Sequence, residues 1–180
     1  MVVQTGRFGQ IEISTDEIIS IPSGILGFSE DQNFCLVDSG DDTLILWLQS
    51  LSNPRLAFPV LEPKIFKRDY IVRLSASELR ELKLESIKDA SVFTILTIPS
   101  NMQEMTANLK APLVINTKTK IAKQVVLQEN DQPIKHPMFN ELRTHLMAIR
   151  SMNQDSATKD QQKAVLQVNS LPITTRVELI

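Results

Sequence analysis

Cysteine is almost missing from this chain of 180 residues, because Cys35 is the only one. A single cysteine excludes an internal disulfide and a cysteine-based metal cluster, and it fits a reducing compartment. The apolar runs are all far shorter than the roughly 20 residues that a membrane-spanning helix needs, and Met1 is not followed by a basic and then apolar leader. We therefore expect a soluble, cytoplasmic protein that contacts no membrane.

Histidine is scarce as well, which limits the chemistry that the chain can perform. His136 and His145 are the only two, and neither stands in a metal-binding spacing. His136 precedes a proline, which favours a turn residue over a ligand or a base. The chain also lacks a GxSxG elbow, a P-loop and a dinucleotide fingerprint. These absences predict that the protein is not an enzyme and uses no metal and no cofactor.

Acidic and basic residues are unevenly distributed along the chain, although its net charge is only −2. Residues 1–50 hold one base against eight acids, a balance of −7, whereas residues 51–136 hold thirteen bases against nine acids, a balance of +4. The acidic block indicates either a face that attracts a basic partner or solvated loops. Because of the basic block, an OB-like nucleic-acid-binding β-barrel remains the alternative interpretation. Aromatic residues make up only 5% and do not alternate with the lysines, so the stacking platforms of such a barrel are missing.

Short segments rich in β-branched residues follow one another and are separated by Gly, Pro, Asn or Asp. They predict a mostly β fold, namely a small antiparallel β-barrel-like domain, because closure removes exposed strand edges. We assign this domain to residues 1–138 and a helical and flexible extension to residues 139–180. The nine segments are residues 8–14, 17–21, 34–38, 44–49, 55–60, 70–74, 91–98, 112–116 and 122–127.

Two helices are expected between and after these strands. In SASELRELKL, Ser75 can cap the first turn while Glu78 returns a hydrogen bond, and Leu79 and Leu82 then face the sheet. A C-terminal helix is predicted over residues 138–152, where apolar residues recur at helical spacing. The polar residues that follow, NQDSATKDQQKA, predict a mobile segment. The last stretch has strand-like residues but no identifiable partner.

The stretch TANLKAPLVINTKTKIAKQVVL, residues 106–127, lies in a strand-rich region but contains residues that are typical of turns and strand ends. Asn108 can bond the neighbouring backbone, and Pro112 suits a strand start because it removes a donor. Asn116 closes that strand before a hairpin loop at residues 117–120. The preference of these residues for turns therefore explains each polar position. It does not explain why a strand edge that lacks a backbone N–H donor is placed in this stretch.

The same stretch resembles the signature of the flagellar assembly factor FliW family, T-x-N-L-x-A-P followed by an apolar residue and x-I-N. Further motifs agree in order and approximate spacing over residues 5 to about 138. These are Phe8-Gly9, IPSGILGF (21–28), LWLQSLSNPRLAFPV (46–60), Asp69-Tyr70 and Lys135-His136-Pro137. Several separate motifs in one order are far more specific than any of them alone.

The resemblance implies a protein that works by exchanging partners. Members of the family bind newly made flagellin in the cytoplasm, and when free they bind and antagonise the translational repressor CsrA, which controls flagellin synthesis. We also expect no direct contact with nucleic acid and a monomer when free. Predicted partner-binding residues, with turn formation as the alternative for several of them, are Asn53, Pro54, Phe58, Tyr70, Asn108, Leu109, Pro112 and Asn116. The predicted acidic surface, with a solvated turn as the alternative, comprises Glu30, Asp31, Asp38, Asp41 and Asp42.

Overall fold

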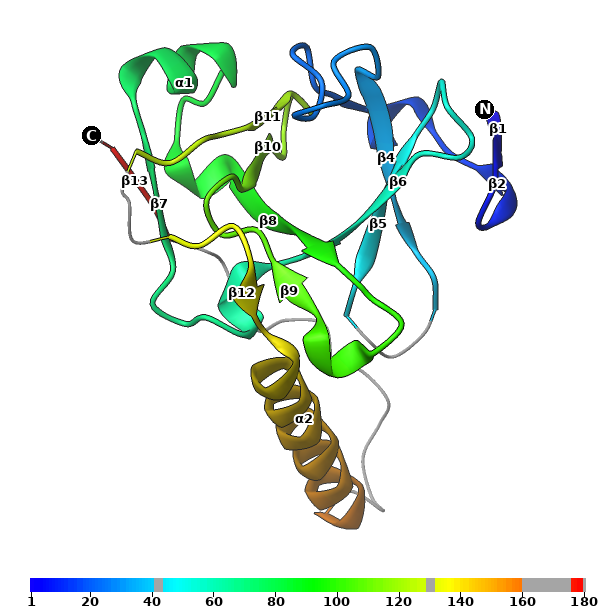
Figure 1. The fold of residues 1–180 in the computed structure, drawn as a ribbon, viewed down its shortest axis with the longest axis vertical. Helices are drawn as coiled ribbons and strands as arrows, with labels where there is room; N and C mark the ends of the chain where they lie inside the picture. Colours follow the sequence, from blue (N-terminus) through cyan, green and yellow to red (C-terminus); the bar gives the residue numbers. More distant parts are fainter. Residues whose placement is uncertain (41–43, 129–131, 160–175, 180) are drawn as a thin grey trace.

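A computed structural model describes residues 1–40, 44–128, 132–159 and 176–179, and the fold is mostly β, as predicted (Figure 1). The strands are β1 (Val2–Thr5), β2 (Gly9–Glu12), β3 (Ile19–Ser20), β4 (Asn33–Asp38), β5 (Leu46–Ser50), β6 (Ala57–Leu61), β7 (Ile71–Leu74), β8 (Ala90–Thr97), β9 (Thr106–Ala107), β10 (Leu113–Asn116), β11 (Ala122–Gln124), β12 (His136–Pro137) and β13 (Arg176–Leu179). The helices are α1 (Ala76–Glu81) and α2 (Phe139–Lys159). Each of the nine predicted segments overlaps one of these strands.

One antiparallel sheet runs in the order β11-β10-β8-β6-β5-β4-β3, and β9 and β12 branch from β8. The sheet curls until its two ends meet at an isolated bridge between Ser20 and Ile121, where Ser20 N donates to Lys120 O at 2.8 Å. This contact stays single because β3 has two residues and β11 has three. The predicted barrel is therefore wrong in one respect. Within the described residues no strand ladder joins β3 to β11, so the sheet is curled and open.

The two faces of the sheet carry separate apolar clusters. The inner cluster joins Ile19 of β3 and Ala122 of β11 with Leu48 of the central strand β5, so it lies inside the curl. The outer cluster includes Val92 and Leu96 of β8 and is covered by β7, α1 and the start of α2. Alternate residues of β8 thus reach different clusters, as the period of two in a strand requires.

Helix α1 begins as predicted. The Ser75 hydroxyl accepts a hydrogen bond from Glu78 N at 3.4 Å, and Ser75 N donates to the Glu78 carboxylate at 2.7 Å. Leu82 is fully buried and Leu79 packs against the outer cluster, which confirms the predicted face. The helix ends at Glu81, and Lys83, just after the C-cap residue Leu82, has a φ of 50° in the left-handed region.

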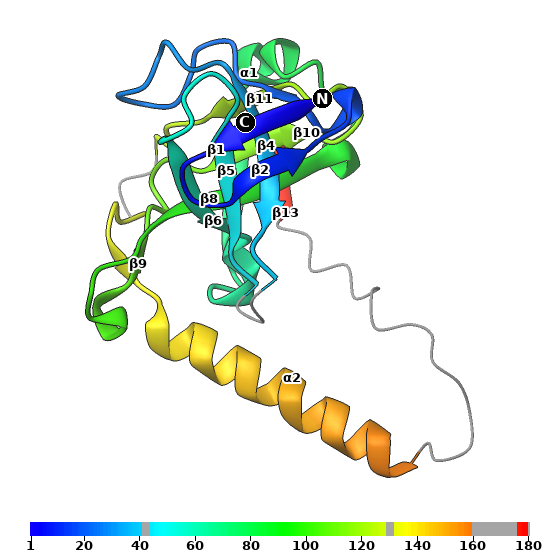
Figure 2. The same cartoon turned by 90° about the vertical axis from the view of Figure 1, so that its right-hand side faces the viewer.

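Helix α2 begins at the predicted place but continues to Lys159, away from the sheet (Figure 2). Met138 just before it is fully buried, Leu142 is nearly so, and Phe139 and Leu146 pack against the outer cluster. Residues 153–159, which the sequence predicts as a mobile segment, continue the helix with good helix formers such as Ala and Lys, and their mobility stays a prediction. Residues 160–164 lie outside the described residues.

Strands β1, β9, β12 and β13 were not predicted. Strand β1 pairs with β2, and the two-residue strands β9 and β12 pair with each other beside β8. Two residues are too few to show a periodic pattern. The partner that the strand-like C-terminal stretch lacked in the sequence is β7, to which β13 pairs in parallel.

Candidate protein-docking surface

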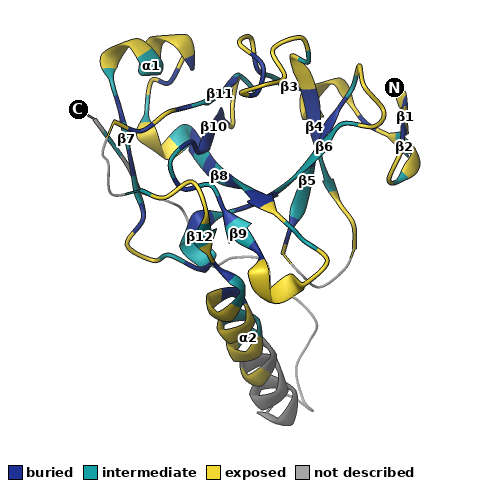
Figure 3. Cartoon of the chain, viewed as in Figure 1, coloured by how far each residue is buried: buried dark blue, intermediate teal, exposed yellow. Residues whose placement is uncertain are grey.

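The inner face of the curled sheet leaves a row of apolar side chains only half-buried. We call this row the concave apolar face, and it consists of Leu36, Leu46, Leu56, Phe58, Phe93 and Ile95. At the open seam of the sheet a shallow pocket runs along it, lined by Glu17, Ile19, Leu36, Ser91, Phe93, Ile115, Thr117 and Lys120. Figure 3 shows the intermediate burial of β5, β6 and β8. The outer face, by contrast, is covered by helices and a further strand.

An exposed turn extends this face to the molecular surface. We call residues 24–28 the apolar loop, in which Leu26 is 60% and Phe28 is 42% exposed. The rings of Phe28 and Phe58 meet edge to face with centroids 5.1 Å apart, and Phe58 in turn lies 6.3 Å from the buried ring of Phe34. A ladder of three aromatic rings therefore leads from the core to the surface, at geometries that favour aromatic pairs.

Backbone conformation holds the apolar loop in this position. Gly24 has a φ of 65°, and Phe28 N donates to Ile25 O at 2.7 Å. Leu26 N donates to the Gln124 side-chain oxygen at 2.9 Å, and the Gln124 amide group donates to Ala111 O at 3.1 Å. Gln124 thus fastens the loop to β11 and to the residue before Pro112.

Of the predicted partner-binding residues, three lie at accessible positions. Asn53 and Pro54 are exposed in the turn before β6, where the Asn53 side-chain oxygen accepts from Arg55 N at 3.2 Å and Pro54 O accepts from Gly6 N at 2.7 Å. Phe58 belongs to the concave apolar face. The turn and the face are separate sites, since Asn53 and Pro54 pack toward the N-terminal hairpin. A partner contact at these three positions stays a prediction.

Another group of predicted contacts is engaged inside the fold. Tyr70 and Leu109 are fully buried, and the Tyr70 hydroxyl donates to Leu109 O at 2.6 Å. Pro112 is buried and its carbonyl accepts from Val125 N at 2.9 Å. The half-buried Asn108 accepts from Lys110 N and Ala111 N, both at 3.1 Å. The Asn108 bonds match the turn-forming alternative, whereas Tyr70, Leu109 and Pro112 are buried in the fold. A contact of these four residues with a partner stays a prediction.

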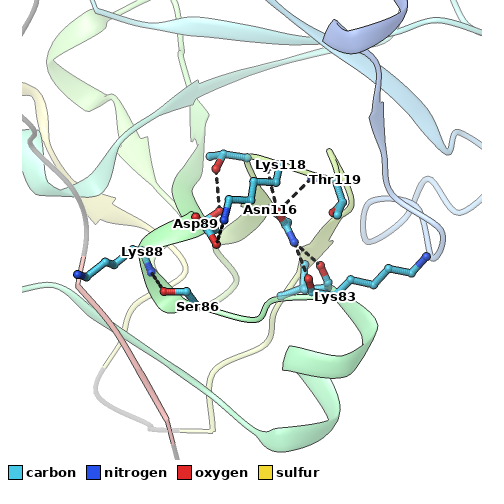
Figure 4. A network of polar contacts seen from close by, with 9 residues as sticks. Lys83, Ser86, Lys88, Asp89, Asn116, Lys118 and Thr119 are labelled. Atoms are coloured by element: carbon cyan, nitrogen blue, oxygen red, sulfur yellow. Dashed lines mark hydrogen bonds and ion pairs between the residues drawn. The ribbon is translucent and has the colours of Figure 1, made fainter.

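Asn116 has a structural role of its own (Figure 4). Its side-chain amide donates to Leu82 O at 3.0 Å and to Lys83 O at 2.8 Å, which are carbonyls at the end of α1. Its side-chain oxygen accepts from Lys118 N and Thr119 N in the hairpin loop. Because Asn116 is 2% exposed, it joins the β10–β11 hairpin to α1 from within.

The same hairpin is fastened to the turn before β8 by Asp89. Asp89 O accepts from Thr117 N at 2.8 Å, and the Asp89 carboxylate lies 2.9 Å from the Lys118 ammonium group. The hydrogen bond to this carboxylate raises the pKa of Lys118. The pair is exposed on the lysine side, so it positions the loop more than it stabilises the fold.

The predicted acidic surface is described at three of its five positions. Glu30 and Asp38 are exposed, and the Asp38 carboxylate accepts from Gly40 N at 2.8 Å. The half-buried Asp31 accepts hydrogen bonds from the hydroxyls of Ser50 at 2.6 Å and Ser52 at 2.8 Å. Negative charge therefore follows the apolar loop directly along the chain. The other two positions, Asp41 and Asp42, lie outside the described residues.

Groups that could act in catalysis are dispersed. Within the described ranges no three His, Cys, Asp or Glu residues come together as a metal site. Cys35 is fully buried, and burial raises the pKa of its thiol. His136 stacks on Phe66 with ring centroids 6.0 Å apart, and burial lowers the pKa of His145 on α2. Among the described residues, no helix is long and apolar enough to span a membrane.

Sequence reasoning did not single out Leu26, Phe28, Leu36, Phe93 or Ile95. One signal for β8 was present, because in SVFTILTI both alternating sets of residues are apolar. Such a strand needs cover on both faces, yet the sequence predicts helices for only one of them. For the apolar loop, the two glycines in IPSGILGF indicated a constrained turn that presents its apolar residues.

These features define a small β-rich protein whose curled sheet keeps one apolar face uncovered. Comparison with known proteins identifies the family. The family model described as FliW protein matches residues 2–138. A flagellar assembly factor FliW from Bdellovibrio bacteriovorus is 37% identical over 179 residues, which cover 99% of this chain and 100% of that protein. One from Bacillus subtilis is 38% identical over 141 residues, covering 78% of this chain and 99% of that protein.

A solved structure agrees with the sequence relatives. The crystal structure of a flagellar assembly factor FliW superposes with a TM-score of 0.72 at 33% identity, covering 76% of this chain and 96% of that one. The chain belongs to the FliW family of flagellar assembly factors.

Proposed function

We propose that this chain is a cytoplasmic, non-catalytic partner-switching protein, monomeric when free, that binds flagellin through the concave apolar face and the apolar loop. The observation that carries the proposal is the uncovered apolar row, continued to the surface by Leu26 and Phe28. A contiguous apolar surface of this kind on a soluble protein marks an interaction site. Membership of the FliW family supports flagellin as the partner.

The geometry suits an amphipathic segment that is not yet packed in a filament. Such a segment lays its apolar side into a groove and leaves its polar side in water. The half-buried rings of Phe58 and Phe93 supply the apolar groove, and Glu17 and Lys120 stand at its open seam. A complex that competes in a cell needs a free energy of binding on the order of −8 kcal/mol.

In the same proposal, free protein binds CsrA and antagonises translational repression. The acidic residues that follow the apolar loop suit a basic, RNA-binding partner and repel phosphate nearby. A switch requires thermodynamic coupling, so flagellin must lower the affinity for CsrA and CsrA must lower the affinity for flagellin by the same factor.

Calorimetry with monomeric flagellin tests the docking surface. We expect Leu26→Asp to weaken binding at least tenfold, because a charge on the loop must be desolvated in the complex. Ile134→Asp is the matched control, since Ile134 is 64% exposed against 60% for Leu26 but lies outside the docking surface. Equal losses in both variants, or no heat with the parent protein at micromolar concentrations, would contradict the proposal.

The acidic residues are tested by charge reversal. We expect Glu30→Lys to weaken binding of CsrA more than binding of flagellin, whereas Glu85→Lys, an exposed glutamate after α1, should change neither. If Glu30→Lys weakens both partners equally, charge at this position does not select between them. The OB-like nucleic-acid alternative predicts instead a direct affinity for RNA that falls steeply as salt rises.

A further inference from the structure

Strand β7 has an edge that pairs with no other described strand within residues 2–138, the segment that the family model matches. In the described part of the chain the only strand hydrogen-bonded to β7 is β13, and Figure 1 shows the two side by side at the margin of the molecule. The inward residues Val72 and Leu74 are fully buried, whereas Ile71 and Arg73 are half-buried. The strand is thus anchored in the core while its edge offers backbone donors and acceptors.

Strand β13 adds to this edge in one register. Its four residues Arg176–Leu179 pair in parallel with Ile71–Leu74, which puts Glu178 opposite Arg73. The Arg73 guanidinium lies 3.3 Å from the Glu178 carboxylate. Backbone hydrogen bonds do not distinguish one sequence from another, so this charge pair is what recognises the residue between Val177 and Leu179.

The strand that fills the edge is an addition to a complete domain. The family model ends at residue 138, and the Bacillus subtilis relative reaches 99% of its own length within 78% of this chain. A solved relative forms the same fold over 96% of its length within 76% of this chain. The Bdellovibrio bacteriovorus relative, by contrast, aligns over 179 residues and so has a counterpart of the extension.

We propose that the edge of β7 is a strand-addition site, separate from the concave apolar face, for an extended peptide with an acidic residue between two apolar ones. The C-terminal strand is its exchangeable occupant from the same chain. A tethered occupant acts at an effective concentration of roughly millimolar. A partner peptide therefore binds the β7 edge only if its affinity and concentration suffice to displace the C-terminal strand. The C-terminal strand therefore sets a threshold for binding at this second site.

A labelled peptide of residues 174–180, TTRVELI, is titrated by fluorescence anisotropy into the full chain and into a chain that ends at Lys159. The shorter chain keeps the whole segment that the family model matches. We expect the peptide to bind the shorter chain at least tenfold more tightly, because its site is empty there. Equal affinity for the two chains, or no binding to the shorter chain at about millimolar peptide, overturns the proposal.

Charge exchange tests the recognition. In the shorter chain, Arg73→Glu should weaken the peptide by roughly two- to fivefold, as expected for a partly exposed ion pair. A peptide with arginine in place of Glu178 should regain that loss on the Arg73→Glu protein. Arg55→Glu, a charge reversal in the turn before β6, is the control and should bind the original peptide unchanged. Failure of the exchanged peptide to regain affinity would show that Arg73 does not select the ligand.

Discussion

Asn116 bonds four backbone groups that belong to two separate segments, the end of α1 and the loop between β10 and β11. All four lose their partner when the amide is removed, and a buried polar group without a partner costs about 1–3 kcal/mol. We therefore expect Asn116→Ala to lower the free energy of unfolding by about 2–4 kcal/mol in urea denaturation. Asn101→Ala removes an exposed asparagine whose bonds are local and should cost less than about 1 kcal/mol. Similar costs for both variants would contradict the joining role of Asn116.

Gly24 fixes the apolar loop because no other residue fits there. A Cβ on Gly24 would stand 2.5 Å from Phe28 O and 2.6 Å from Ser29 Cα, and its φ of 65° disfavours any side chain. The backbone conformation alone costs an alanine about 1–2 kcal/mol, to which the clash adds. We expect Gly24→Ala to lose more than about 2 kcal/mol of stability and to weaken flagellin binding.

Gly27 provides the comparison within the same loop. Its φ is 85°, but a Cβ there meets nothing within 4 Å. Gly27→Ala should therefore show the conformational cost without the clash, both in urea denaturation and in calorimetry with flagellin. If Gly24→Ala is no worse than Gly27→Ala, the close approach to Phe28 does not hold the loop.

At the scale of elements, local sequence patterns predicted those helices and strands whose formation depends on neighbouring residues. The capping box at Ser75 and Glu78 fixed the start of α1, and short β-branched segments between turn residues located the nine main strands. Closure could not be predicted, because whether β3 and β11 form a ladder depends on how far the sheet curls. The pairing of β13 with β7 was equally hidden, since it joins segments about a hundred residues apart. Among the predicted contacts, alternation could not show that Tyr70 and Leu109 turn inward.

Helix α2 carries a group that makes its packing sensitive to pH. The Nε2 atom of His145 is buried without a hydrogen-bond partner among the described residues, in a groove that it shares with Arg68 and Glu141. Burial, and secondly the charge of Arg68, lower the pKa of His145 below its ordinary value of 6.5. The unfolded chain then binds the proton more readily than the folded one.

This difference gives the pH dependence its sign. Since the unfolded state takes up more protons, the free energy of unfolding falls as the pH drops below about 6.5, and the loss continues until the folded-state pKa is reached. We expect His145→Gln to flatten this fall between about pH 7 and pH 5.5, measured by urea denaturation at each pH. A variant with the same slope as the parent protein would remove His145 as the cause.

At the scale of the whole molecule, the apolar core does not end at residue 138, where the family motifs end. The domain boundary predicted there stays a prediction. Met138 is fully buried and Leu142 is 5% exposed, whereas Met147 is 57% exposed. The first turns of α2 therefore cover the outer face of the sheet, whereas β13 near the end of the chain pairs with the edge of β7. Stability should follow this division.

The contribution of α2 to stability is measured by comparing the Tm of three chain lengths. A chain that ends at Lys159 should keep a Tm close to that of the full chain, because both keep the first turns of α2 over the outer cluster. A chain that ends at Pro137 exposes the cluster and loses two buried side chains worth about 1.5–3 kcal/mol each. At roughly 2–4 °C per kcal/mol, its Tm should fall by about 10 °C or more. Leu142→Ala in the full chain tests the same contact if the shortest chain does not fold, with an expected cost of about 2–5 kcal/mol. An unchanged Tm at Pro137 together with a neutral Leu142→Ala would place the whole of α2 outside the folded core.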